Sequence, residues 1–212
     1  MMRLTPVVKN LVIINVIVFI VWLLSDTFGD AGRQFMASNF LLFKSELVIS
    51  HDLYGGLFKP VQLVTHFFSQ KDILHIAFNM LALASIGPAV ESALGSKRFF
   101  SFYIFTGLVS GVLVWLFDPS DYPVLGASGA ISGVIAAFAY IYPRAPLSFF
   151  FLPPFEAKKF AIGIAVISAV LIIAEFRGFG NVGGISHFGH LMGMIGAVIY
   201  FYAEKYLPFL PK

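Results

Sequence analysis

Four polar side chains interrupt the longest apolar stretches of this sequence: His75, Asn79, Ser128 and His190. Ionisable and amide side chains at membrane depth cost free energy, so by default they indicate a functional site. A hydroxyl and an imidazole can act as nucleophile and general base, and two further donors can hold the oxyanion that forms when a carbonyl is attacked. These residue types therefore suit attack on a carbonyl, provided that the fold brings them together.

His75 and Asn79 stand four residues apart in the stretch LHIAFNML. Residues at i and i+4 share one face of a helix, so both side chains can donate toward one point. This arrangement suits an oxyanion hole. The alternative is that Asn79 hydrogen-bonds a neighbouring helix while His75 lies at the membrane interface.

Ser128 lies in LGASGAISG, directly before the apolar run VIAAFAY. This position predicts a hydroxyl and a backbone amide near a helix N-terminus, where unpaired amides and the helix dipole favour negative charge. The residue two positions later is Ala130, so the G-x-S-x-G elbow of soluble hydrolases does not apply. The alternative is that Ser128 is only a small residue for helix packing.

His190 begins a face that continues through Gly193 and Ala197, and Gly129 with Gly133 forms a matching groove beside Ser128. Small residues let two membrane helices approach closely, which a serine and a histidine need before they can hydrogen-bond. Gly126, just before Ser128, is assigned to the same set of packing glycines. A metal site at His187 and His190 is not expected, because no HExxH motif and no nearby carboxylate completes a ligand set.

The composition indicates which elements position these residues. Hydrophobic residues make up 58% of the 212 residues and charged residues only 12%, and the mean hydropathy is +0.87. Such values are typical of a polytopic membrane protein. There is no cysteine, which excludes disulfides and thiolate catalysis, and no basic run that would bind nucleic acid. We expect residues 1–212 to form one membrane domain.

Apolar runs predict six transmembrane helices, because a bilayer core of about 30 Å needs about 20 mostly apolar residues per helix. The second, fourth and fifth runs are shorter than a full crossing. Either their ends extend into flanking polar residues, or they are broken beside protein-lined cavities. The predicted spans are Val8–Leu24, Ile73–Ala89, Phe99–Phe117, Ala127–Ile141, Phe160–Ala174 and Phe188–Tyr206.

The basic residues predict the orientation. Nine of the 14 Lys and Arg residues fall on the side of the two termini, which places both termini in the cytoplasm by the positive-inside rule. No small-residue cleavage site follows the first span, so we interpret it as a retained anchor. The long first outer loop, from Ser25 to about Lys71, carries many aromatic and aliphatic residues. We expect it to lie partly in the outer interface, with a folded cap outside the membrane as the alternative.

Taken together, H75-x-x-x-N79, G126-A-S128-G129 and H190-L-M-G193 in the second, fourth and sixth spans resemble the rhomboid intramembrane serine proteases. Thr65-His66, the E91-S-A-L-G95 stretch and the long first loop add to the similarity. The resemblance implies an all-α, six-helix bundle with a Ser-His dyad that opens to a water-filled cavity on the extracytoplasmic side. It implies Ser128 as nucleophile, His190 as base, and His75, Asn79 and the Ser128 amide as oxyanion donors, with no cofactor.

The sequence departs from the family at three places. Ser132 replaces an aromatic residue often found four positions after the nucleophile, Val61-Gln62 replaces a common Trp-Arg pair, and Gln70 replaces a frequent histidine. The orientation of His190 and the docking of the first loop are therefore expected to rely on other contacts.

The expected function is hydrolysis of peptide bonds in or beside transmembrane segments of other proteins. The expected partners are such substrates and the lipid bilayer in which they meet the active site. A helical peptide bond is shielded by its own backbone, which favours small or helix-breaking residues near the cut. One alternative is a catalytically silent relative that serves as a membrane chaperone or scaffold. Another is a small transporter or channel, which would need charged residues at mid-membrane that this sequence lacks. A bacterial inner membrane is the expected location.

Overall fold

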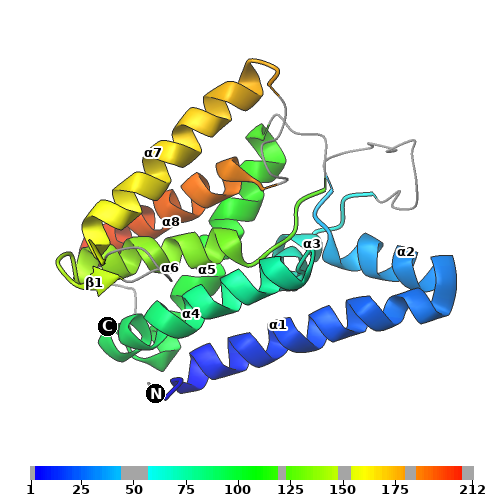
Figure 1. The fold of residues 1–212 in the computed structure, drawn as a ribbon, viewed down its shortest axis with the longest axis horizontal. Coiled ribbons are helices and arrows are strands. Elements are labelled where there is room, and N and C mark those ends of the chain that lie inside the picture. Colours follow the sequence, from blue (N-terminus) through cyan, green and yellow to red (C-terminus); the bar gives the residue numbers. More distant parts are fainter. Residues whose placement is uncertain (1–2, 44–56, 119–122, 148–153, 180–184, 207–212) are drawn as a thin grey trace.

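The computed structural model describes residues 3–43, 57–118, 123–147, 154–179 and 185–206, and these residues form an all-α bundle with one short hairpin (Figure 1). A helix lies at each of the six predicted spans. Their bounds are α1 Pro6–Ser25, α4 Ile73–Leu94, α5 Ser96–Phe117, α6 Ser128–Ile141, α7 Ala157–Phe176 and α8 His187–Tyr206.

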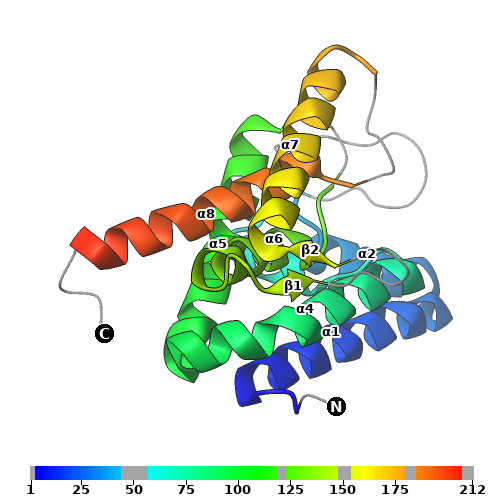
Figure 2. The ribbon, with the colours of Figure 1, turned by 60° about the vertical axis from the view of Figure 1, so that its left-hand side comes forward.

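Helix α6 occupies the middle of the bundle, in contact with α4, α5, α7 and α8. Helix α1 packs along α4 on one side, and α7 lies on the other side against α6 and α8 (Figures 1 and 2). The central position explains the composition of α6, whose buried face consists of glycine, alanine and serine with a few larger side chains. Small residues permit close helix approach from several directions at once.

Among the described residues, four helical segments are long and apolar enough to cross a membrane: α4, α5, α7, and α1 with its helical continuation to Phe40. Helices α4 and α7 extend beyond their predicted bounds, so the second and fifth spans are not short. Helix α6 does stay short. Its 14 residues rise about 21 Å at 1.5 Å per residue, less than a bilayer core of about 30 Å. Helix α6, which has Ser128 as its first residue, is therefore too short to span such a core by itself.

Glu91 joins the ends of three helices. Its carboxylate accepts hydrogen bonds from the backbone amides of Val7 (3.1 Å) and Val8 (2.9 Å) and from the hydroxyl of Thr5 (2.5 Å), which caps the start of α1. It also accepts from Ser96 Oγ (2.6 Å), the first residue of α5. A carboxylate satisfies the unpaired amides at a helix N-terminus and complements the helix dipole. The E91-S-A-L-G95 stretch therefore fastens α1 and α5 to the end of α4.

The first outer loop is largely helical where it is described. It contains the 3-10 turn η1 Asp26–Phe28, α2 Gly29–Phe40, α3 Gln62–Thr65 and the 3-10 turn η2 His66–Phe68. The fully buried Gln62 donates to the carbonyls of Ser38 (2.9 Å) and Leu57 (3.1 Å) and accepts from the Lys59 amide (3.1 Å). One side chain thus holds both ends of the loop together, the task expected of contacts that replace the family's Trp-Arg pair. Part of the predicted loop, residues 44–56, lies outside the described residues.

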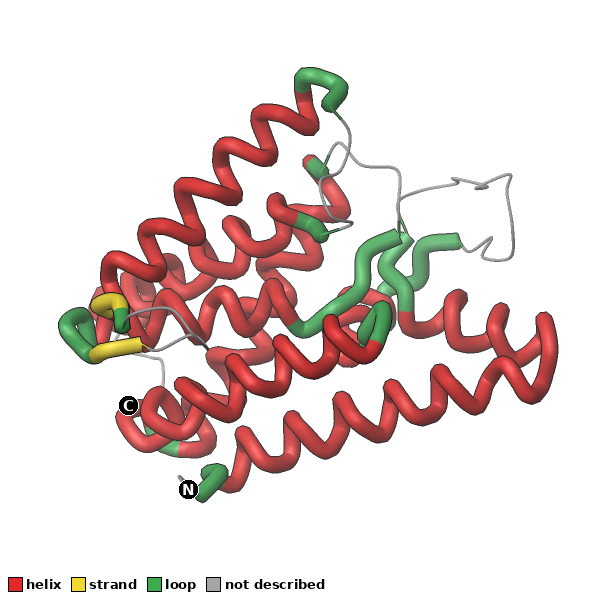
Figure 3. The backbone as a smooth tube through the Cα atoms, in the orientation of Figure 1, coloured by secondary structure: helices red, strands yellow, loops and turns green. Residues whose placement is uncertain are grey.

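The connection between α6 and α7 spans residues 142–156. Its described ends form a short antiparallel ladder, β1 Pro146–Leu147 with β2 Phe155–Glu156. At the opposite end of the bundle, the loops that precede α4 and α6 and the one that follows α2 converge near the start of α6 (Figure 3). The candidate site is built at this convergence.

Candidate active site

Hydrogen bonds to the first loop fix the segment that leads to Ser128. Leu42 and Val124 exchange two backbone hydrogen bonds of 2.9 Å each, and the Gly126 amide donates to the His66 carbonyl over 2.9 Å. Helix α6 then begins at Ser128, as predicted. The Ser128 amide is consequently one of the first-turn amides that have no partner within the helix.

Gly126 is required by two independent features. Its φ is 121°, a conformation that residues with a side chain rarely adopt. In addition, a Cβ at this position would lie 2.7 Å from His75 Cε1 and 3.0 Å from His75 Nε2. The same point is 3.7 Å from Ser128 Oγ. Gly126 therefore lets the imidazole of His75 approach the start of α6, beside the serine hydroxyl.

The start of α4 fixes His75. Asp72 caps this helix by accepting the His75 amide over 2.8 Å. The backbone amide of Lys71 donates to His75 Nδ1 over 3.2 Å. Because Nδ1 accepts, the neutral ring carries its proton on Nε2. His75 is thereby a hydrogen-bond donor on the edge that faces Gly126.

The four polar residues singled out in the sequence line one cavity of about 380 Å³ between α4, α6 and the start of α8. His75 and Asn79 belong to α4, Ser128 to α6 and His190 to α8. Each of the four is buried or half-buried. The described residues that line it are Lys71, Asp72, Leu74, His75, Phe78, Asn79, Leu125, Ser128, Ile185, Ser186 and His190.

Ser186 positions the beginning of α8. Its hydroxyl accepts the Gly189 amide (3.0 Å) and donates to Asp118 Oδ2 (3.1 Å) at the end of α5, while its carbonyl accepts the His190 amide (3.2 Å). The ring of His187 meets that of His190 edge-on, with centroids 6.1 Å apart.

His190 Nε2 is buried and has no hydrogen-bond partner within the described part of the chain. Among the same residues, no hydrogen bond joins it to Ser128 Oγ. A buried polar atom without a partner is uncommon and calls for a physical reason. A nitrogen that must accept a proton during a reaction supplies such a reason, since a permanent donor would occupy its lone pair.

Helices α6 and α8 meet at Gly129 and Gly193, as the small-residue faces predicted. A Cβ on Gly193 would overlap the carbonyl group of Gly129, and one on Gly129 would overlap the hydroxyl of Ser110. Ser110 in turn donates to the Gly189 carbonyl over 2.8 Å. The backbones touch at the residue after Ser128 and one turn after His190, so close packing brings the two side chains to one cavity.

Two of the packing glycines have other partners than expected. A Cβ on Gly133 would lie 2.6 to 2.8 Å from the side chain of Thr106, so this glycine faces α5 and not α8. Position 133 shares a helix face with position 129, four residues earlier, whose Cβ would likewise meet an α5 side chain, Ser110. Gly126 precedes α6 and serves the loop conformation and His75, so it is not a helix-packing residue.

The selection of polar residues in apolar runs did not include Asn15, a fully buried amide in the middle of α1. The criterion that selected Asn79 would have selected it as well. Gln70 (3% exposed) drew notice as a departure from the family, but its burial and contacts were not predicted. Ser110 and Ser186 carry no sequence signal of their own, because serine is common in membrane helices.

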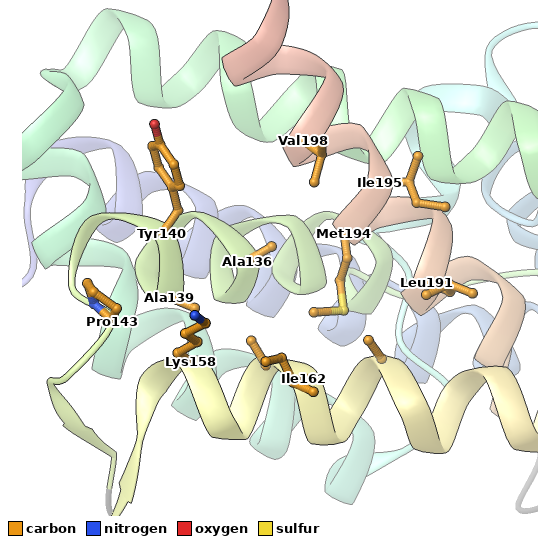
Figure 4. Close-up of a pocket in the computed structure, with 12 residues that line it drawn as sticks. Ala136, Ala139, Tyr140, Pro143, Lys158, Ile162, Leu191, Met194, Ile195 and Val198 are labelled. Carbon is orange, nitrogen blue, oxygen red and sulfur yellow. The ribbon is translucent and has the colours of Figure 1, made fainter.

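A second cavity of about 480 Å³ lies between α6, α7 and α8 (Figure 4). Met194, Leu191 and Ile162 are among its lining residues, and Lys158 stands at the end near Pro143. Apart from Lys158 and the hydroxyl of Tyr140, its side chains are apolar. The candidate catalytic residues do not line this cavity.

The geometry defines a helical membrane protein in which a serine, two histidines and an asparagine share a partly buried cavity. The model of the Rhomboid domain matches residues 58–206, which include all four residues. Rhomboid protease GluP of Bacillus subtilis is 38% identical over 152 residues, covering 71% of this chain and 26% of that protein. The chain therefore belongs to the rhomboid family.

Two further relatives are mitochondrial proteins. Rhomboid protein 1 of Saccharomyces cerevisiae is 33% identical over 155 residues, covering 68% of this chain and 40% of that protein. RHOMBOID-like protein 12 of Arabidopsis thaliana is 31% identical over 206 residues, covering 86% of this chain and 54% of that protein. The chain thus spans from about a quarter to about half the length of these three relatives.

Proposed function

We propose that this protein is an intramembrane serine endopeptidase that hydrolyses peptide bonds in or near transmembrane segments of other membrane proteins. The observation that carries the proposal is the shared cavity of Ser128, His190, His75 and Asn79. A nucleophile, a base and two donors are the groups that peptide hydrolysis requires. The family supports the same reaction class.

In the proposed reaction, His190 Nε2 accepts the proton of Ser128 while the hydroxyl oxygen attacks the scissile carbonyl carbon. The carbonyl oxygen becomes an oxyanion, stabilised by the Ser128 amide, His75 Nε2–H and Asn79 Nδ2–H. His190 then protonates the leaving amine, and a water molecule, activated by the same base, releases the acyl group from Ser128. Among the described lining residues, the one carboxylate is that of Asp72, which accepts a hydrogen bond from the His75 amide, so we propose a dyad.

The orientation is a separate part of the proposal. Both termini lie in the cytoplasm, the cavity opens to the extracytoplasmic side, and the membrane is a bacterial inner membrane. The excess of basic residues on the side of the termini supports this orientation. Because the chain has no cysteine, Arg144→Cys and Arg177→Cys give single-cysteine variants on opposite sides. An impermeant maleimide added to intact cells should label the second and not the first, and the reverse pattern would invert the topology.

The activity is tested with purified protein in liposomes, using a transmembrane substrate and a serine-directed fluorophosphonate. Wild type is expected to cleave the substrate and to be labelled, and Ser128→Ala and His190→Ala should do neither. Persistent cleavage by Ser128→Ala would overturn the nucleophile assignment. Folded wild type that neither cleaves nor labels would favour a catalytically silent relative.

A further inference from the structure

Three buried side-chain amides from separate segments form a continuous hydrogen-bonded chain that ends at Asn79. Asn79 Nδ2 donates to Gln70 Oε1 over 2.7 Å, and Gln70 Nε2 donates to Asn15 Oδ1 over 2.7 Å. Asn15 Nδ2 donates to the Leu11 carbonyl over 2.9 Å. Asn15 belongs to α1, Gln70 to the segment before α4, and Asn79 to α4.

The backbone carbonyl at one end fixes the direction of the whole chain. A carbonyl can only accept, so Asn15 must present its NH2 group to Leu11 and its oxygen to Gln70. Gln70 must then present its NH2 group to Asn15 and its oxygen to Asn79. The Asn79 amide is thereby left one orientation, with its nitrogen on the side of Gln70. An amide that could flip would otherwise offer either oxygen or nitrogen to its surroundings.

The orientation of Asn79 decides whether it can stabilise an oxyanion. An amide NH2 group carries two hydrogens, and in Asn79 the hydrogen bond to Gln70 uses one of them. No acceptor for the second occurs among the described residues, and Asn79 lines the cavity with Ser128. A flipped amide would bring its oxygen close to the developing negative charge, which would raise the barrier instead of lowering it.

We infer that Gln70, itself held by Asn15, is a positioning residue that keeps the Asn79 amide in its donating orientation. The inference rests on the proposed function, because it assigns Asn79 to the oxyanion. Gln70 and Asn15 are 3% and 0% exposed, so water does not substitute for a lost partner. The segment before α4 and helix α1 thus act on the reaction through one side chain.

The test is a double-mutant cycle measured as substrate cleavage in liposomes. Gln70→Leu removes both hydrogen bonds at similar volume and should lower kcat roughly tenfold with little change in KM, less than the loss expected on removing a donor outright. In the Asn79→Ala background, Gln70→Leu should have no further effect, because it acts through Asn79. Gln70→His should retain most of the activity, since a neutral imidazole offers one acceptor and one donor.

Gln62→Leu is the matched control. Gln62 is also a fully buried glutamine with several hydrogen bonds, but its partners lie in the first loop and not at Asn79. Its replacement should lower cleavage by the same factor with and without Asn79→Ala. A structural effect is additive in this way, whereas a positioning effect disappears when the positioned group is removed.

A spectroscopic measurement keeps the inference testable without turnover. The side-chain ¹⁵N–H resonances of Asn79, assigned by their loss in Asn79→Ala, should shift in both Gln70→Leu and Asn15→Leu and stay unchanged in Gln62→Leu. Unshifted resonances in Gln70→Leu, normal kcat in that variant, or equal factors in both backgrounds would each overturn the positioning role. Equal cleavage by wild type and Ser128→Ala would instead remove the proposed function, and the inference with it.

Discussion

The two cavities described above share α6 and α8 but have opposite chemistry. The cavity beside α4 holds Ser128, His190 and Asn79, and the one beside α7 is lined almost entirely by apolar side chains. Their volumes are similar, about 380 and 480 Å³. Size therefore does not distinguish them. The cavities differ in which face of each helix lines the space. They also differ in whether nearby helix ends supply polar groups.

The contrast is sharpest between His190 and Leu191 on α8. These neighbours in sequence line different cavities, since successive helical residues point about 100° apart. On α6 the division runs along the axis: Ser128 stands at the N-terminal end, whereas Ala136 and Ala139 lie beside α7 further on. A single helix can thus line a polar cavity and a largely apolar one.

Replacing His190 and Leu191 in turn should give the largest difference in activity between the two cavities. His190→Ala should lower cleavage by roughly 10³-fold or more, because the base is lost. Leu191→Ala should leave kcat close to wild type and lower the free energy of unfolding by about 1 to 2 kcal/mol, since the side chain is half-buried. Cleavage assays and thermal unfolding in detergent measure the two effects. Comparable loss of activity in both variants would mean that the cavities are not functionally separate.

Asn79→Ala is expected to have the next largest effect on cleavage. Removing an oxyanion donor costs about 10² in kcat, and the protein should remain folded because the vacated space borders a cavity. Steady-state kinetics with circular dichroism on the same sample checks both statements. Normal turnover would exclude Asn79 from the oxyanion role while leaving Ser128 and His190 untouched.

The close approach of α6 and α8 should have a smaller effect on rate and a clear effect on stability. Gly193→Ala places a methyl group against the Gly129 carbonyl, so the helices must separate, at a cost of about 1 to 3 kcal/mol and about tenfold in kcat. Gly163→Ala on α7, where a Cβ would meet nothing within 4 Å, is the control. Equal behaviour of the two variants would contradict the packing argument.

The smallest effect is predicted for the apolar cavity. Met194→Leu keeps the volume of a buried side chain that lines it, so the free energy of unfolding should fall by less than about 1.5 kcal/mol. Cleavage should be unchanged within error, because Met194 does not line the space around Ser128. A marked drop in kcat would show that the apolar side of α8 controls the position of His190.

Much of the architecture follows from local sequence. Long apolar runs predicted the six helices, and the glycine-framed Ser128 predicted the start of α6, because both depend on short-range composition. The extent of α4 was missed, since Pro88 and Glu91 suggest an earlier end than Leu94. Glu91 is tolerated there because it binds the start of α1, a contact between residues more than 80 positions apart.

The four polar residues that share the cavity could be predicted from the sequence. The residues that hold them in place could not. Asn79 stands out because an amide is costly in an apolar run, yet nothing near it in sequence indicates Gln70 or Asn15 as partners. Gly133 shows the same limit: its size was informative, but its partner Thr106 depends on how α5 crosses α6. Tertiary contacts of this kind are set by the whole bundle and leave no pattern of spacing.

The carboxylate of Glu91 also bears on the order in which the chain assembles during synthesis. It is located on α4 and caps α1, and its fourth donor is Ser96, at the start of α5. Helix α1 leaves the ribosome long before position 91 is made, and until then its first amides lack this partner. The contact that caps α1 therefore cannot form until α4 has been synthesised as far as Glu91.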